Sequence, residues 1–386
     1  MICGMIIMVK SMKVVKKKKL KPIYSKILKI LGIILLISLG LFLFYIKQIN
    51  DLTRLGYSKE ASRKILFSFK KDYVLSIGEN KTLNAAFESK DYIEDNLEFY
   101  RKIKYVNHKH LIRNINKLLT VGYNPNDINI IITHGSDEAV ERFSKREKIK
   151  YLEEFFSVSY AKLDNYDRYV KYSMDTGEDE ELTVLYVNLD LDLNDYENSV
   201  LVSDFSLTML VNKHRYLSEE FEPDDLVKID SKYASSNDLY CSRLALNAYK
   251  KMSEAAAKEG YSIIINSAYR SYQDQVDLSD LYLKTYGEKY VEKFVAKPGY
   301  SEHQTGLAFD IGSLYSNVFA NSKEYGWMKD NAYKYGFIER FTKKYEGITG
   351  FRSEPWHYRY VGVDVATEIH DNDMTLEEYY VINLDK

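Results

Sequence analysis

The 386-residue chain has only two cysteines, Cys3 and Cys241, and no excess of basic residues. Its formal net charge is −2, and its first 29 residues contain nine lysines and no acid, so residues 30–386 carry −11. Because nucleic-acid binding needs a basic footprint, this acidic portion argues against a nucleic-acid partner. The motif His-Glu-x-x-His is also missing, which excludes the helix-borne zinc site of the zincin peptidases.

A run of seventeen uncharged residues, Ile30–Ile46, is at the short end for crossing a hydrocarbon core of about 30 Å. Tyr24 and Tyr45 lie near the two expected interfaces. The lysines before the run predict that residues 1–29 form a cytoplasmic tail and that the chain after about residue 47 lies outside the cell. A cleaved signal peptide is the competing interpretation. No small-x-small cleavage site follows Ile46, so a retained membrane anchor at 30–46 is favoured.

The two cysteines would then lie on opposite sides of the membrane, and no internal disulfide is expected. An extracellular portion of about 340 residues must be stabilised by its hydrophobic core, and this length is sufficient for two domains.

Residues 47–204 are predicted to form a mainly helical extracellular region with two degenerate repeats. Leu52–Lys59 resembles Leu118–Pro125 at an offset of 66 positions, and Phe99–Tyr105 resembles Tyr166–Tyr172 at an offset of 67. Each repeat is expected to close on a short strand; the two predicted strands are Ile130–Thr133 and Leu182–Asn188. The region is interpreted either as a spacer that holds the next domain off the membrane or as a module that binds substrate or a protein partner.

Residues 205–386 are predicted to form an α+β domain, with helices flanking an antiparallel sheet. An amphipathic helix is expected from Ser242 to Gly260, with Leu244 and Met252 among the residues on its apolar face. A buried strand follows at 261–266, and Ser271-x-x-Asp274 is a capping box that starts a helix running to about Tyr286. Further strands are expected around 306–312 and 356–361.

Two histidines and an aspartate in this domain form a candidate zinc site. In the segment 306–312, Asp310 lies in a predicted strand between Phe309 and Ile311, where a carboxylate is costly unless it is paired or binds a metal. His303 lies seven residues before it, and His357 follows in Glu354-Pro-Trp-His357. Two imidazoles and one carboxylate, with a fourth position for water, are a catalytic rather than a structural zinc set.

Glu354 is the expected general base, which accepts a proton from the attacking water and passes it to the leaving amine. This role requires a bend at Pro355, because residues three apart on a straight strand face opposite ways. The alternative is that Glu354 pairs with Arg352 or Arg359.

Arg270, between the predicted strand and the next helix, is suited to binding a substrate carboxylate or a developing oxyanion. A structural ion pair is its alternative. Gln275 and Ser301 are further candidates for substrate hydrogen bonding, and Trp356 is expected either to form the floor of the site or to fill the core.

Three blocks of this sequence resemble the VanY-type zinc D-alanyl-D-alanine carboxypeptidases: Ser267–Gln275, Lys297–Asp310 and Glu354–Tyr358. Their order and spacing also match, over roughly residues 205–370. The resemblance implies an α+β fold, one bound Zn²⁺, and removal of the C-terminal D-alanine from a peptidoglycan stem peptide outside the cell. The residues it implies are the zinc ligands His303, Asp310 and His357, the catalytic base Glu354, and the substrate or transition-state clamp Arg270.

The resemblance leaves the bond that is cut undecided, because related enzymes include D,D-carboxypeptidases, L,D-carboxypeptidases and endopeptidases. A non-catalytic wall-binding module is the alternative from another class. A signalling or scaffold protein whose function lies in the helical repeats is a third interpretation.

Overall fold

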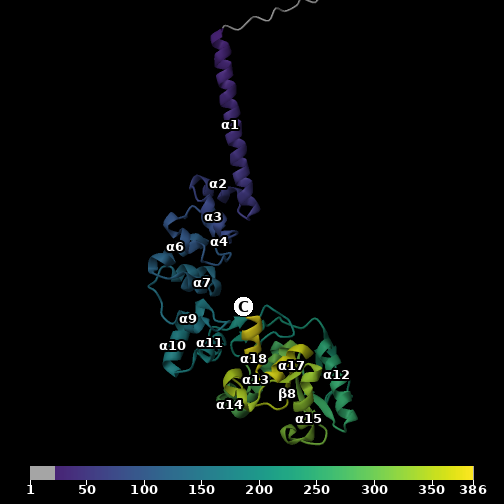
Figure 1. Ribbon diagram of the computed structural model, residues 1–386. Coiled ribbons are helices and arrows are strands. Elements are labelled where there is room, and N and C mark those ends of the chain that lie inside the picture. The colour runs from purple at the N-terminus through teal and green to yellow at the C-terminus, as the bar shows by residue number, and fades with distance from the viewer. Residues whose placement is uncertain (1–21, 386) are drawn as a thin grey trace, which may run out of the picture. The chain divides into compact units, whose positions relative to one another are not determined.

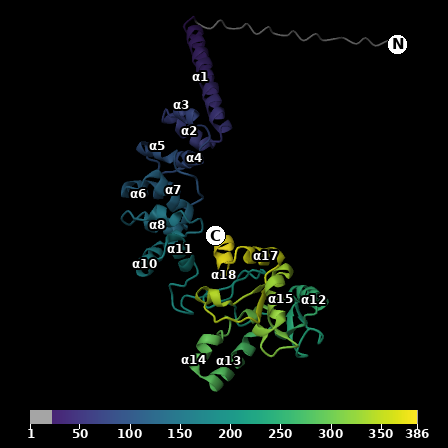
Figure 2. The same ribbon diagram turned by 60° about the horizontal axis from the view of Figure 1, so that its bottom comes forward.

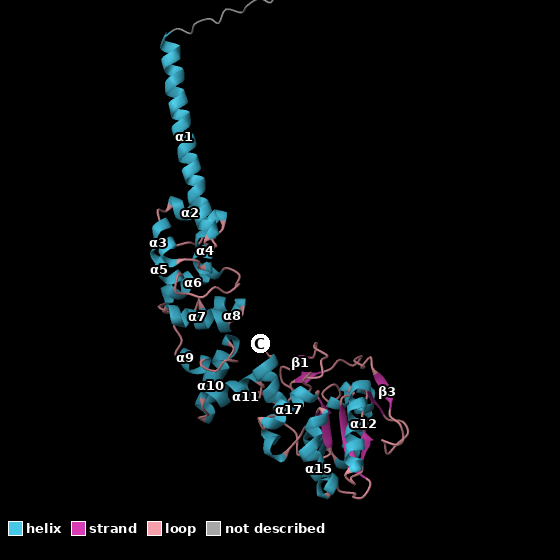
Figure 3. Ribbon diagram, turned by 45° about the vertical axis from the view of Figure 1, so that its right-hand side comes forward, coloured by secondary structure: helices cyan, strands magenta, loops and turns pink. Residues whose placement is uncertain are grey.

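A computed structural model describes residues 22–385 of the chain (Figure 1). The described part divides into two compact units. The first extends to Asn129 and includes Glu141–Lys148, and the second comprises Ile130–Val140 together with the chain from Ile149 onwards. Helices predominate up to about residue 190, and the strands are confined to the remainder of the second unit (Figure 3). Residues 1–21 of the predicted cytoplasmic tail, including Cys3, lie outside the described residues.

The first helix, α1 (Pro22–Arg54), contains the predicted apolar run. Among residues 22–385 it is the one helix long and apolar enough to cross a membrane, and its position near the N-terminus is compatible with either an anchor or a signal peptide. The helices that follow are short: α2 (Lys59–Phe67), α3 (Lys71–Ile77), α4 (Lys81–Glu88), α5 (Leu97–Tyr100), α6 (Leu111–Val121), α7 (Pro125–His134), α8 (Asp137–Phe143), α9 (Leu152–Phe156), α10 (Tyr166–Thr176) and α11 (Glu180–Asn188).

The two strands predicted at Ile130–Thr133 and Leu182–Asn188 are wrong, because both segments lie in helices, α7 and α11. Asn124 caps the first helix by accepting hydrogen bonds from Asn126 N and Asp127 N, and Pro125 occupies its first turn. The buried isoleucines of α7 are then spaced at i, i+3 and i+4, so one helix face takes up the apolar run that suggested a strand. In α11 the capping residue is Asp179, which accepts from Leu182 N.

A similar buried hydrogen-bond arrangement occurs twice in the helical region. Asn116 accepts hydrogen bonds from Asn96 and Tyr100 and donates one to the carbonyl of Asp91. Asn188 makes the matching bonds with Asn165, Tyr169 and the carbonyl of Tyr160. Because a buried carboxamide is costly unless it is hydrogen-bonded, each asparagine ties a helix to the preceding loop.

The second unit contains a four-stranded antiparallel sheet in the order β5-β6-β8-β7. Its strands are β5 (Ile263–Ser267), β6 (Ala308–Ser313), β8 (His357–Tyr360) and β7 (Phe337–Glu339). Two small ribbons precede it: β1 (Val200–Leu201) pairs with β2 (Arg215–Tyr216), and β3 (Leu226–Lys228) pairs with β4 (Tyr240–Ser242). The helices are α12 (Arg243–Lys258), α13 (Tyr272–Tyr286), α14 (Glu288–Phe294), α15 (Lys323–Asn331), α16 (Glu346–Thr349), α17 (Val363–Asp371) and α18 (Leu376–Tyr379).

Helices cover both faces of the sheet, as a mixed α and β fold requires. Phe337 of β7 belongs to the core that includes α12 and α15, whereas its neighbour Ile338 belongs to a separate cluster with α17 and α18. Helix α12 forms where expected, but its buried face centres on Tyr249 and Met252, and Leu244 is exposed. Cys241 is a buried free thiol.

Candidate active site

The pairing of β6 with β8 brings two of the candidate metal ligands together, since Asp310 and His357 are direct cross-strand partners. The third, His303, lies on a 3₁₀ turn, Glu302–Thr305, capped by the hydroxyl of Ser301. This turn ends at Gly306, whose φ of +67° favours glycine, and a Cβ there would lie 3.2 Å from the backbone N of Ser242. The turn therefore passes close to β4 before the chain enters β6.

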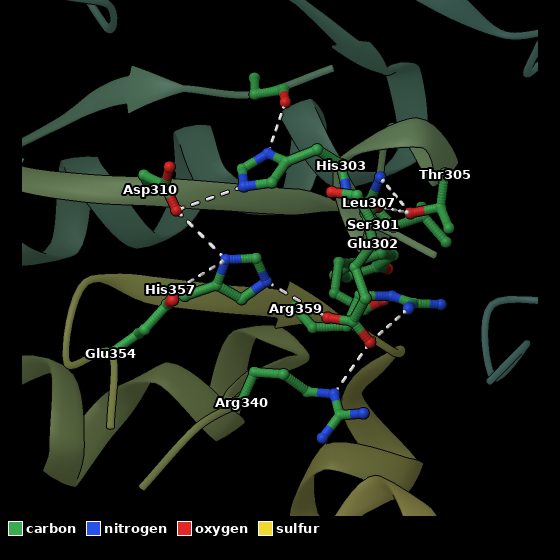
Figure 4. Close-up of polar contacts among 12 residues, drawn as sticks. Ser301, Glu302, His303, Thr305, Leu307, Asp310, Arg340, Glu354, His357 and Arg359 are labelled. Atoms are coloured by element: carbon green, nitrogen blue, oxygen red, sulfur yellow. Dashed lines mark hydrogen bonds and ion pairs between the residues drawn. The ribbon is translucent and has the colours of Figure 1, made fainter. Parts of the chain in front are cut away.

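Each imidazole has one ring nitrogen held by a partner, so that the other faces Asp310 (Figure 4). His303 Nδ1 lies 2.6 Å from the carbonyl of Ala268, and this contact requires a proton on Nδ1. His357 Nε2 lies 3.2 Å from a carboxylate oxygen of Glu302. The remaining nitrogens, His303 Nε2 and His357 Nδ1, lie 3.4 and 3.2 Å from Asp310 Oδ1.

This geometry fits a tetrahedral zinc ion. Metal–ligand bonds of about 2.05 Å place two tetrahedral ligands about 3.3 Å apart, close to the two distances measured to Asp310. All three ligand atoms lie within 4.8 Å of one another. A second partner fixes the orientation of each ring, as is usual for histidines that bind zinc.

The electrostatics of the three groups favour a cation between them. Burial alone would raise the pKa of Asp310, but His303 and His357 hold that pKa well below its usual range. Burial opposes a charge on His357, yet hydrogen bonds to Asp310 and Glu302 raise its pKa to about 9. For His303, burial and the nearby Arg270 lower the pKa. The site therefore stabilises positive charge at His357 Nδ1 and keeps His303 neutral, which suits a bound metal.

Glu354 lies beside these groups because the chain turns just before β8. A hydrogen bond of 2.9 Å from His357 N to Glu354 O closes a turn that contains Pro355. One carboxylate oxygen of Glu354 lies 3.9 Å from His357 Nδ1, so the bend on which its predicted role depends is present. Burial, opposed by His357 and reinforced by Asp310, raises the pKa of Glu354 to about 7.

Neither arginine considered as a partner of Glu354 pairs with it among the described residues. Arg352 pairs with Glu346 at 2.9 Å, and Arg359 pairs with Glu302 at 2.9 Å. The Glu354 carboxylate is therefore not neutralised by either of these arginines.

Glu302 is the residue of the site that sequence reasoning missed. It is fully buried, and one of its oxygens accepts from Arg340 Nε at 2.8 Å and from Arg359 Nη1 at 2.9 Å. Its other oxygen contacts His357 Nε2 (Figure 4). Arg340 also binds Glu377 of α18 through two hydrogen bonds of 2.8 and 2.6 Å. Despite burial, these arginines hold the pKa of Glu302 well below its usual range.

The candidate ligands line a cavity of about 560 Å³ together with the five other predicted site residues, Arg270, Gln275, Ser301, Glu354 and Trp356. Within residues 22–385, the Nε of Arg270 and the Oε1 of Gln275 are buried without a hydrogen-bond partner. Burial lowers the pKa of Arg270, whereas Asp310 and Glu354 act to raise it. Because unpaired buried polar atoms are costly, both groups are suited to receive a polar ligand.

The positions of two further side chains bear on their predicted roles. Ser301 is buried, and its hydroxyl caps the turn that carries His303. Trp356 is 42% exposed, so it lies on the wall of the cavity and does not fill the core.

The family model for VanY, described as D-alanyl-D-alanine carboxypeptidase, matches residues 238–363. The Bacillus subtilis protein named "Putative carboxypeptidase YodJ" is 45% identical over 184 residues, which cover 45% of this chain and 67% of the relative. The bifunctional D-Ala-D-Ala dipeptidase and D-Ala-D-Ala carboxypeptidase VanXYC of Enterococcus gallinarum is 34% identical over 178 residues, 44% of this chain and 92% of the relative. The chain belongs to the VanY-type D-alanyl-D-alanine carboxypeptidase family.

The family match leaves the helical region uncovered. A solved structure of the LdcB LD-carboxypeptidase is 41% identical, covers 48% of this chain and 90% of that chain, and has a TM-score of 0.45. The chain spans only 50% and 56% of the lengths of two enterococcal D-alanyl-D-alanine carboxypeptidases, from Enterococcus faecalis and Enterococcus faecium.

Proposed function

We propose that this protein is a membrane-anchored zinc carboxypeptidase that removes the C-terminal D-alanine from peptidoglycan stem peptides. The observation that carries the proposal is the convergence of His303, Asp310 and His357 in one cavity with Glu354 and Arg270. Family membership supports the reaction class, and both D,D- and L,D-carboxypeptidases remain candidates for the bond that is cut.

A zinc ion held by His303, Asp310 and His357 would lower the pKa of a water molecule and polarise the scissile carbonyl. Glu354 would accept one proton from the attacking water and transfer it to the nitrogen of the departing D-alanine. A C–O bond forms between the water oxygen and the carbonyl carbon, and the C–N bond of the peptide breaks. The products are a carboxylate and a free amine. Arg270 would bind the terminal carboxylate of the substrate, and Gln275 Oε1 would accept a hydrogen bond from a substrate N–H. In the same cavity, Ser301 and Trp356 would contact the stem peptide.

We propose further that α1 anchors the protein, with the basic tail in the cytoplasm and the catalytic unit on the cell-wall side. The apolar run in α1 and the lysines before it support this topology. The remainder of the helical region up to residue 204 would act as a spacer or as a site for a protein partner.

The direct test is to incubate the full-length protein in detergent with stem pentapeptides and tetrapeptides and to follow the products by mass spectrometry. Loss of one alanine from the pentapeptide alone would indicate D,D specificity, and loss from the tetrapeptide would indicate L,D specificity. Cleavage within a cross-linked muropeptide would indicate an endopeptidase.

Metal content is measured in the same samples. If zinc is bound but no substrate is cleaved, the carboxypeptidase proposal is wrong and a wall-binding module becomes the better interpretation. As a control for mechanism, Glu354→Gln should keep the metal and lose most turnover, whereas His357→Ala should lose both.

A further inference from the structure

Helices α13 and α14 form a hairpin that is scarcely packed against the rest of the second unit. Within α13 only Gln275 is buried, and α14 buries no residue. The two helices meet at Gly287, whose φ of +82° permits the sharp turn between them. Figure 2 shows them side by side at the edge of the unit, away from α12 and α15. The hairpin is therefore held mainly at its base.

Four aromatic side chains on this hairpin, spaced four residues apart in the sequence, contact one another, and we call them the aromatic row: Tyr282, Tyr286, Tyr290 and Phe294. They recur at four-residue intervals on either side of Gly287, so each helix places two of them on one face. Neighbouring ring centroids lie 5.5 Å apart for Tyr282–Tyr286, 4.6 Å for Tyr286–Tyr290 and 4.8 Å for Tyr290–Phe294. The rings are tilted by about 30° to each other. Because the centroids of Tyr282 and Tyr290 are also only 6.0 Å apart, the three tyrosine rings form a compact cluster that Phe294 extends.

Three members of the aromatic row line the candidate active site, and the fourth lies outside it. Tyr282, Tyr290 and Phe294 line the same cavity as Arg270 and the candidate metal ligands, whereas Tyr286 does not. Tyr286 is 57% exposed, and Phe294 is 44% exposed. Contiguous exposed aromatic surface is uncommon on soluble proteins and typically marks a binding site.

The chemistry of the row favours an uncharged ligand with one apolar face. Segment 272–294 carries five acidic residues and three lysines, which does not suit a polyanion. Tyrosine rings offer a flat apolar surface with a hydroxyl at the edge. A pyranose ring matches this surface, because its axial C–H groups form an apolar face and its hydroxyls lie around the rim.

The substrate itself carries such a ring outside the cavity. An extended peptide spans at most about 3.3–3.6 Å per residue, so a stem of four or five residues reaches roughly 13–18 Å from its cleaved end. Its other end, where it is joined to the saccharide, therefore emerges from the cavity. We propose that the aromatic row binds the saccharide to which the stem peptide is attached, with Tyr286 as its member outside the cavity. This inference rests on the proposed carboxypeptidase function.

The test compares two substrates that share one stem peptide, one free and one still joined to its disaccharide, using the full-length enzyme in detergent. Tyr286→Ala should lower the ratio of kcat/KM for the glycan-linked substrate to that for the free peptide by roughly three- to tenfold, chiefly through KM. Tyr286→Trp keeps an aromatic face and should retain most of the ratio. Leu283→Ala alters another exposed apolar residue, which lies outside the row, and should leave kcat/KM for both substrates unchanged.

The outcomes separate this inference from the proposed function. If the wild-type enzyme cleaves neither substrate, the carboxypeptidase assignment itself fails. If it cleaves both and Tyr286→Ala leaves the ratio unchanged, the aromatic row does not bind the saccharide. An equal fall in kcat/KM for both substrates, with unchanged thermal stability, would mean that the row contacts the peptide, and this result would also overturn the inference.

Discussion

Replacing Glu302 by Gln tests whether a buried charge network supports the candidate metal site. The change keeps the shape of the side chain but removes the anion that Arg340, Arg359 and His357 share. Arg340 retains Glu377, but Arg359 keeps only uncharged hydrogen-bond acceptors among the described residues, the backbone carbonyls of Leu207, Met209 and Tyr360. One positive charge in a fully buried cluster then has no counterion.

The magnitude follows from burial. The side chains of Glu302, Arg340 and Arg359 are 2%, 1% and 0% exposed, so solvent screens the lost interaction very little. Breaking a buried pair by removing one partner costs about 3–5 kcal/mol. For a unit of this size, each kcal/mol lowers Tm by about 2–4 °C, so a fall of roughly 6–20 °C is expected. Because Glu302 also orients His357, zinc affinity should fall about 10- to 100-fold.

Thermal unfolding is measured by circular dichroism with a chelator present, so that loss of metal does not contribute to the difference in Tm. Zinc affinity is measured separately by competition with a chromophoric chelator. Glu346→Gln is the matched control, because its pair with Arg352 lies at the surface, where solvent screens it, and its loss should change Tm little. A Tm for Glu302→Gln within the range of this control would refute the reasoning.

Three further predictions concern the metal, the substrate and the helical region. Chelation should abolish hydrolysis and lower Tm, and zinc at 100 times its Kd should restore about 2.7 kcal/mol of stability; activity that survives exhaustive chelation would contradict a metal mechanism. Arg270→Met should lower kcat/KM for carboxylate-ended peptides by roughly 10- to 150-fold but change that for the C-terminal amide far less; equal losses on both would argue against carboxylate binding. Asn188→Leu leaves partners in Asn165, Tyr169 and Tyr160 unsatisfied and should cost about 1–3 kcal/mol, measured by urea unfolding, whereas Thr176→Ala at the exposed end of α10 should cost under 1 kcal/mol.

Local sequence signals predicted the elements that carry the site. The capping box at Ser271 starts α13 as expected, and the strands around Asp310 and His357 pair with each other. The capping box and the individual strands depend on neighbouring residues, so they can be predicted from the sequence alone. Strands were predicted where α7 and α11 lie, because runs of β-branched residues are typical of strands. The capping residue that precedes each run starts a helix there.

The charge network around Glu302 could not be assembled in the same way. Arg340, Arg359 and Glu377 are 38, 57 and 75 positions away in the sequence, and only the packing of the sheet against α18 brings them together. The sequence signal that could have indicated this network is Glu302 itself. It is a carboxylate next to a candidate ligand, and it lies in a compact turn between the cap at Ser301 and the glycine at 306. A charge there requires buried partners.

The second unit separates the groups proposed for chemistry from those proposed for recognition. His303, Asp310 and His357 are fixed by strand pairing, by a capped turn and by buried ion pairs, and each has little freedom to move. Trp356 and the aromatic row are exposed and are carried by a turn and by a loosely packed hairpin. Substitutions on that rim should therefore alter the proposed recognition of peptide or glycan without displacing the candidate metal ligands. The choice between D,D and L,D cleavage should accordingly depend on residues around Trp356, and zinc affinity should be unaffected when they are exchanged.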